Sequence, residues 1–417
     1  MNPDDSPKAK SFAAFRHPGF RAYFVLTAVT MMADNIEHVI SYWVLFQKFH
    51  SPALGGFAVL SHWLPFLFFA LWSGSLADRH DPRRIMQIGI GMFIFVSLAW
   101  GVLFVTDTLE VWHACVLLVI HGFAGVFWNP AGQLLLYDIV GPTQLQSAVR
   151  LNATAFTLGR LVGPAVGGGL MLALGPTYGI LANALFYLPL MLWLWKAPYG
   201  PAFRKEPRVA GRAVRTLGDI LGAIRDIAGN RVIVSMTLLA GFASLFVAGG
   251  YSAQMPEFAH DLGHGDAGLS YSMLLAADAA GALIAGIALE SRSLLQPRPR
   301  TAFILAMLWC FAMAGFAASS SYPLALALLL VAGFLELSYS SMSQALVQLA
   351  APDNMRGRVI GLFHMSSAGM RAFSGISIGL VGSLIGIHWS LALSSMALLA
   401  VVLGLAAFTV RTRKPLA

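Results

Sequence analysis

The stretch Gly74-Ser-Leu-Ala-Asp-Arg-His-Asp-Pro-Arg-Arg84 is a short polar segment between two long apolar runs, at 54–76 and 84–105. Each run is long enough to cross the hydrocarbon core of a bilayer, which takes about 20 apolar residues. A basic segment between two such runs is typical of a loop on the cytoplasmic side of a membrane. The stretch therefore predicts a helical membrane protein and orients two of its helices.

The composition of the whole chain supports this prediction. Of the 417 residues, 57% are hydrophobic and only 11% are charged, so polar surface is too scarce to cover a soluble globule. The net charge of +8 does not indicate nucleic-acid binding, because that would need a basic face on a soluble domain and none is long enough. The two cysteines, Cys115 and Cys310, both lie in apolar runs, so we expect no disulfide framework.

Apolar runs separated by Gly, Pro and turn clusters predict twelve spans, in an all-α integral membrane fold. They lie near 20–46, 54–76, 84–105, 111–137, 145–173, 178–195, 231–255, 267–289, 301–319, 323–349, 357–386 and 389–410. Most of the 27 Lys and Arg residues then fall on one side, which the positive-inside rule makes cytoplasmic. We expect both termini on that side of a bacterial-type inner (plasma) membrane, and no removable signal peptide.

The one long polar stretch divides the chain into two halves. It predicts an N-terminal six-helix bundle at 1–196, a basic cytoplasmic linker at 197–230 and a C-terminal six-helix bundle at 231–417. An interfacial helix is expected near Val214–Ile227. Duplicated halves of this kind place a substrate site between them, near the middle of the membrane.

Ionisable residues inside spans are costly and mark candidate transport machinery. In the span 20–46, Asp34, Glu37, His38 and Ser41 share one helical face. Two carboxylates so close repel each other when both are ionised, so they could bind and release a proton during a transport cycle. The alternative is a structural ion pair of these acids with Arg160 or Arg371.

Further candidates for the transport pathway are solitary charges in other spans, namely Arg160, Asp278, Glu336 and Arg371. Solitary histidines, at His62, His121 and His364, are either proton carriers or packing residues. We expect no metal site, because the sequence has no His-x-x-x-His pair within a span and no Cys-based spacing, and its other histidines are scattered.

Two motifs give the chain a family resemblance. The stretch Gly74–Arg84 resembles the loop signature of the major facilitator superfamily, and Gly159-Arg-Leu-Val-Gly-Pro-Ala-Val-Gly-Gly168 resembles its antiporter signature. The pattern Phe15-Arg-His-Pro-Gly-Phe-Arg21 is similar to the branch that contains enterobactin and macrolide exporters. The chain departs from proton-coupled drug exporters at Leu118-Val-Ile-His-Gly122, where they carry an arginine.

The resemblance implies two pseudo-symmetric bundles and a conformational gate. It implies that Asp78 contacts the segment Met355–Arg358 and that Arg83 joins Asp138. Small residues in the second motif would permit tight helix packing. The residues to which it assigns gating are Gly74, Asp78, Arg79, Arg83, Asp138, Gly159, Gly163, Pro164 and Gly167.

These observations predict a secondary active exporter rather than an enzyme. We expect it to move a small amphipathic organic molecule, drug-like or siderophore-like, by alternating access and in exchange for protons. No Gly-x-x-x-x-Gly-Lys-[Ser/Thr] loop is present, which favours an ion gradient over ATP. Alternatives are a carrier of a metal ion, metal chelate or lysolipid, a membrane enzyme or sensor, and a passive channel. The expected partners are the substrate, protons and the lipid bilayer, with no nucleic acid and no cofactor, and the expected state is a monomer.

Overall fold

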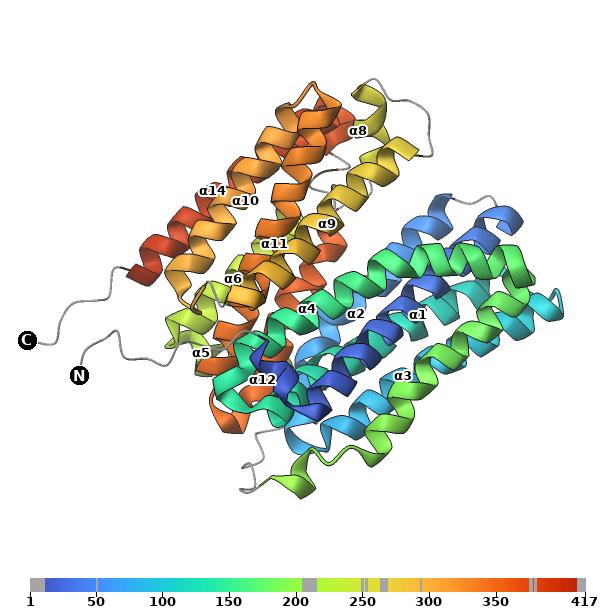
Figure 1. The fold of residues 1–417 in the computed structure, drawn as a ribbon, viewed down its shortest axis with the longest axis horizontal. Helices are drawn as coiled ribbons and strands as arrows, with labels where there is room; N and C mark the ends of the chain where they lie inside the picture. The colour runs from blue at the N-terminus through green and yellow to red at the C-terminus, as the bar shows by residue number, and fades with distance from the viewer. Residues whose placement is uncertain are drawn as a thin grey trace, which may run out of the picture.

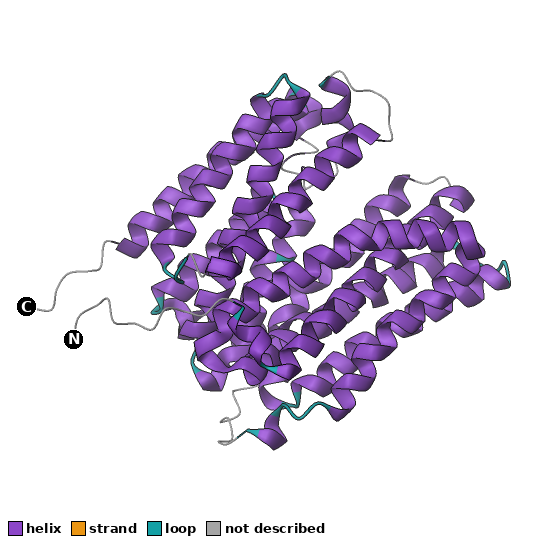
Figure 2. Cartoon of the chain, in the orientation of Figure 1, coloured by secondary structure: helices purple, strands orange, loops and turns teal. Residues whose placement is uncertain are grey.

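The computed structural model describes residues 12–49, 52–204, 216–248, 251, 254–262, 269–292, 295–374, 378 and 381–410. Within these ranges every regular element is a helix (Figure 2). Helices α1 to α4 form one bundle and helices α6 to α14 form the other (Figure 1). The all-helical, two-bundle architecture is therefore confirmed.

By its backbone hydrogen bonds, the N-terminal bundle consists of four helices. They are α1 Pro18–Phe49, α2 Pro52–Arg79, α3 Pro82–Val105 and α4 Val111–Lys196, preceded by the 3-10 helix η1 Ala13–Arg16. The backbone of α4 breaks at Gly141 and Gly175, where φ is 70° and 74°. A proline follows each break, and the Gly-Pro order suits the end of one helix and the first turn of the next. The breaks divide α4 into three passes, close to the expected spans.

The C-terminal bundle begins after the 3-10 helix η2 Pro201–Phe203 and the amphipathic helix α5 Leu217–Ala228. Part of the expected interfacial helix lies in α5, while Val214 lies outside the described residues. The remaining elements are α6 Arg231–Phe246, α8 Met255–Asp261, α9 Leu269–Arg292, α10 Pro299–Ala318, α11 Tyr322–Ala350, η3 Asp353–Met355, α12 Arg356–Ser367, η4 Gly369–Phe373, α13 Val381–Ile385 and α14 Ile387–Val410. The domain boundaries expected from the sequence stay a prediction.

Two expected spans are wrong as continuous helices. The span 231–255 ends at Phe246, and a separate short helix, α8, begins at Met255 with a proline in its first turn. The span 357–386 is interrupted where α12 gives way to the 3-10 helix η4. A Cβ at Gly369 would lie 2.6 Å from Cα of Leu67, so the chain approaches α2 there more closely than another residue would allow. Glycine and serine also weaken an α-helix at this point.

Seven helices among the described residues are long and apolar enough to cross a membrane, and the bent pair α5–α6 would bring the number to eight. One of the seven is α4, which contributes three passes. Helix α1 is not among the seven, although its 32 residues are long enough. The count of twelve spans thus stays an expectation.

The bundles meet at one end and separate toward the other (Figure 1). The end where they meet carries the turn between α2 and α3 and the start of α12; we call it the basic end. Each bundle has its own aromatic core. Phe93 and Tyr187 stack at 5.4 Å in the N-terminal bundle, and Trp309 and Tyr339 lie 5.1 Å apart in the C-terminal one. Such contacts stabilise the interior of each bundle.

Candidate functional site

A cavity of about 770 Å³ lies between the two bundles. This volume is within the range of sites for small organic molecules. Its wall combines aromatic rings with charged groups from both halves. The rings are those of Trp63, Phe66, Phe93, Trp128, Phe156, Tyr339 and Phe363, and the charged groups are Asp34, Arg160, Asp278, Glu336 and Arg371. Five of the seven pathway residues expected from the sequence therefore line one cavity, while Glu37 and His38 do not.

Two carboxylates of the C-terminal bundle share a tyrosine in this wall. The hydroxyl of Tyr251 lies 3.1 Å from Oδ2 of Asp278 and 3.4 Å from Oε2 of Glu336. A phenol has one hydrogen to donate, so it can satisfy only one of the two acids at a time. Oδ1 of Asp278 is buried without a hydrogen-bond partner. The acids expected to be solitary thus form a pair, and no sequence pattern identifies Tyr251 as its third member.

The two intramembrane arginines face the same cavity from opposite bundles. Arg160 comes from α4 and is exposed to the cavity, and Arg371 comes from η4. The guanidinium of Arg371 lies 4.9 Å from the ring centre of Trp63 in the other bundle, and its Nε is buried without a hydrogen-bond partner. Neither arginine forms an ion pair with a described acidic residue. Both cations are therefore available to a negatively charged group in the cavity.

Asp34 and Glu37 of α1 contact a histidine and not one of the arginines expected from the sequence. Asp34 and Glu37 are only 4% and 2% exposed, and both contact His121 of α4. Nδ1 of His121 lies 2.7 Å from Oε1 of Glu37, and its Nε2 lies 3.0 Å from Oδ1 of Asp34. Glu37 also accepts a hydrogen bond from Ser97. The structural ion pair with an arginine is thus wrong for the described residues, and a histidine takes its place.

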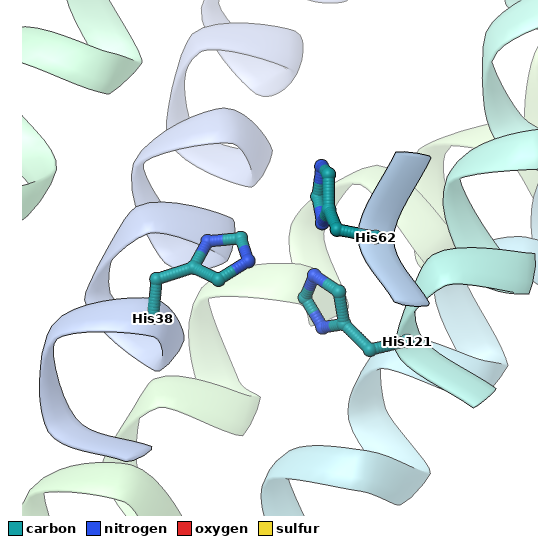
Figure 3. Close-up of side chains that lie close together, drawn as sticks. All are labelled: His38, His62 and His121. Carbon is teal, nitrogen blue, oxygen red and sulfur yellow. The ribbon is translucent and has the colours of Figure 1, made fainter. Parts of the chain in front are cut away.

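The expectation that the histidines are scattered is also wrong. His38, His62 and His121 come from α1, α2 and α4, and their rings face one another (Figure 3). In its expected span, each histidine lies a similar number of residues from the end opposite the basic loops. That common depth is a signal in the sequence, whereas a search for paired histidines on one helix misses it.

The basic end is held together by contacts of Asp78. Its Oδ1 and Oδ2 accept hydrogen bonds from the backbone N–H groups of Gly357 and Arg358, at 2.5 and 2.9 Å. These groups open helix α12, where a carboxylate also interacts favourably with the helix dipole. The contact between Asp78 and the segment Met355–Arg358 is confirmed. A Cβ at Gly74 would lie 2.1 Å from the carbonyl oxygen of Gly357, so the two backbones touch.

Other contacts between the bundles close the same end. Ser147 donates to Glu290, which also lies 3.5 Å from Nε of Arg150. The guanidinium of Arg356 lies 3.7 Å from the ring centre of Tyr137. The side chains of Gln133 and Gln348 are joined by a hydrogen bond of 2.8 Å. This set of contacts seals the cavity from the basic end.

The expected pair of Arg83 with Asp138 is not formed. Arg83 binds Asp81 at 2.6 Å and donates to the carbonyl oxygen of Ala197 at 2.5 Å. Asp138 binds Arg204 at 2.7 Å. Asp81 caps α3 two residues before Arg83, so the arginine finds an acid on its own turn before it could reach α4. Arg79 is exposed at the end of α2.

The glycines of the second motif pack against α1. A Cβ at Gly159 would lie 2.6 Å from Cβ of Met31, and one at Gly163 would lie 2.6 Å from Cβ of Asn35. Gly167 continues this face, where a Cβ would lie 3.3 Å from Cα of Ile36. Pro164 lies beside them and lines the cavity. The motif thus joins two helices of one bundle and keeps α1 close to the cavity.

Comparison with known proteins gives the same picture. The family model for transmembrane secretion effectors matches residues 9–416. The enterobactin exporter EntS of Salmonella typhimurium is 24% identical over 382 residues, which cover 88% of this chain and 86% of that protein. The multidrug efflux pump Tap of Mycolicibacterium fortuitum is 24% identical over 364 residues, covering 86% of each. The crystal structure of the human organic anion transporter MFSD10 has the same fold, with a TM-score of 0.74 at 16% identity, covering 93% of this chain and 100% of that one. The chain belongs to the transmembrane secretion effector family, within the major facilitator superfamily of membrane transporters.

Proposed function

We propose that this transporter exports a small amphipathic organic molecule that carries an acidic group, by alternating access and in exchange for protons. The cavity between the bundles is the observation that carries this proposal. Its aromatic wall suits an apolar skeleton, and Arg160 and Arg371, which form no ion pair with an acid in the described part of the chain, offer two cations to an anionic group. The names of the relatives, an enterobactin exporter and a multidrug efflux pump, support outward movement of such compounds.

Alternating access needs a gate on each side of the cavity, and the contacts of Asp78 supply one of them. The basic end is closed, so the cavity belongs to a form that receives or releases its substrate at the opposite end. The positive-inside rule supports a cytoplasmic basic end, with both termini on that side of the inner membrane. The described form is then the outward-facing one.

Proton exchange is supported by the pair Asp278 and Glu336. Both acids lie in the wall of the substrate cavity and compete for the hydroxyl of Tyr251. Two carboxylates in one low-dielectric site titrate as a unit. A substrate anion held by the arginines would change the electrostatic field at this pair and so link its proton to transport. Asp34 adds a third carboxylate to the wall and is a candidate for substrate contact.

Arg371→Gln tests the substrate class. In proteoliposomes with an imposed pH gradient, the wild type should move amphipathic organic acids, and the variant should lose at least about tenfold in apparent affinity, because a charge-assisted contact contributes about 1.5–3 kcal/mol. Arg300→Gln, which removes an exposed arginine at the start of α10, is the control. The anion proposal fails if the wild type moves only cationic or neutral compounds, or if both variants behave alike.

Asp78→Asn tests the gate. The change leaves an acceptor but removes the charge at the start of α12, and we expect it to weaken the closed basic end by about 1–2 kcal/mol, a factor of about 5–30 in population. Distances between spin labels on the two bundles at the basic end measure the shift. Asp81→Asn is a matched control, since Asp81 caps α3 within one bundle. An unchanged distance distribution for Asp78→Asn would contradict the gating role.

A further inference from the structure

Three imidazoles and a carboxylate converge within the N-terminal bundle. The ring centres of His38 and His121 lie 4.7 Å apart, those of His38 and His62 lie 4.9 Å apart, and those of His62 and His121 lie 5.4 Å apart. One ring nitrogen from each histidine can be chosen so that all three lie within 4.8 Å of one another (Figure 3). Asp34 contacts two of these rings.

The two ring nitrogens of His121 face two different carboxylates. A carboxylate only accepts hydrogen bonds, so the contact with Glu37 places the ring hydrogen on Nδ1. The other nitrogen, Nε2, is buried and lies 3.0 Å from Oδ1 of Asp34, so the atom that it faces is another potential metal ligand. Histidines that bind metals are commonly held this way, with one nitrogen donating to a carboxylate and the other facing the ion.

A ring nitrogen of the neighbouring His62 is unsatisfied. Nδ1 of His62 is buried without a hydrogen-bond partner, beside the rings of His38 and His121. Buried polar atoms are nearly always hydrogen-bonded in folded proteins. The unpartnered nitrogen of His62, in a cluster with two further imidazoles and the Asp34 carboxylate, therefore points to a ligand that accepts electron pairs from these groups.

We propose that His38, His62 and His121, together with Asp34, bind a divalent transition-metal ion such as Zn²⁺ or Co²⁺. Imidazole nitrogens with one carboxylate oxygen suit these metals and not Ca²⁺ or Mg²⁺, which prefer oxygen ligands. Ligands at about 2.0–2.1 Å from a tetrahedral ion lie roughly 3.3 Å from one another. The oxygen of Asp34 and Nε2 of His121 already have about this spacing, and small rotations of His38 and His62 bring in the remaining two donors.

The surroundings of the cluster meet two further needs of a metal site. Asp34 and His62 line the central cavity, so an ion has a path to the donors, while His121 and Glu37 lie behind them. Glu37 is itself held by Ser97, whose hydroxyl is 3.3 Å from the amide nitrogen of Asn183. The carboxylate that orients His121 is thus fixed on both sides. The donors come from three helices, which is why no metal-binding spacing is seen in the sequence.

Titration of the purified full-length protein with Co²⁺, after removal of any affinity tag, tests this site. Tetrahedral Co²⁺ bound to nitrogen absorbs visible light, and we expect one equivalent to bind with this spectrum and to be displaced by Zn²⁺. His62→Ala and His121→Ala should each lower the affinity by at least about tenfold. Glu37→Gln should weaken binding by about 10–100-fold without removing a ligand, because it releases the orientation of His121.

The control is His364→Ala, which removes a buried histidine of the C-terminal bundle that lines the same cavity. Its affinity for Co²⁺ should equal that of the wild type. If one of the other variants fails to fold, the wild-type spectrum and the remaining variants decide. The site is refuted if the wild type binds no Co²⁺ at millimolar concentration, or if the His62→Ala variant binds it unchanged. The measurement needs no gradient and no exported compound, so its failure is separate from failure of the proposed export.

Discussion

Replacing Gly74 with Ala should shift the transporter toward forms that are open at the basic end. Alanine is the better helix former by about 1 kcal/mol, so α2 itself gains stability. Its Cβ, however, would lie 2.1 Å from the carbonyl oxygen of Gly357, which is backbone and cannot rotate away. Overpacking of this kind costs about 1–3 kcal/mol. The closed basic end should lose up to about a hundredfold in population, and transport should slow accordingly.

Spin-label distances across the basic end and transport in proteoliposomes both measure this effect. Gly91→Ala is the matched control: it makes the same change inside α3, where the new Cβ would lie 3.6 Å from Cε of Met191, an ordinary contact. That variant should keep wild-type distances and rates. If Gly74→Ala also keeps them, the close approach of α2 to α12 is not part of the gate.

Much of the fold follows from local sequence signals. Gly141 and Gly175 adopt positive φ and are each followed by proline, so the three passes of α4 can be placed from the sequence alone. Asp81 with Pro82 marks the start of α3 in the same way. Where the signal is not local, the prediction fails. The break at Gly369 depends on how closely η4 approaches Leu67, which no pattern within 357–386 reveals.

The candidate site, like the fold, could be predicted only where the signal in the sequence is local. Membrane burial alone singles out Asp34, Asp278, Glu336 and the two arginines, because any charge in a span needs a reason to be there. Their partners, however, depend on the rotation and depth of each helix. The spacing of Asp34 and Glu37 predicts that they share one face of α1, but the histidine that they contact, His121, comes from α4. For Arg83 the partner is local, because Asp81, two residues earlier, binds it in place of the expected Asp138.

The gate and the cavity are linked by the chain itself. Helix α12 begins at the contacts of Asp78, and η4, which follows α12 directly, carries Arg371 into the cavity. Gly361 of α12 also packs closely on α2, where its Cβ would lie 2.5 Å from the carbonyl oxygen of Ala70. Opening the basic end must move α12 away from α2. The same movement would take Arg371 away from Trp63, so we expect opening of the gate to change the shape of the proposed substrate cavity.

Replacing either acid of the pair Asp278 and Glu336 with its amide should uncouple transport from the proton gradient. In each of the variants Asp278→Asn and Glu336→Gln, the substituted side chain keeps its shape beside Tyr251 but can no longer exchange a proton. We expect uptake driven by a pH gradient in proteoliposomes to fall by at least about tenfold, while exchange of labelled for unlabelled substrate at equal pH persists, because binding and rocking remain intact. Glu257→Gln, an exposed acid of α8, is the control and should stay coupled. The split between the two assays is decisive: a variant that loses both has lost its substrate site, and a variant that keeps both shows that protons are carried elsewhere, which contradicts the role of this pair.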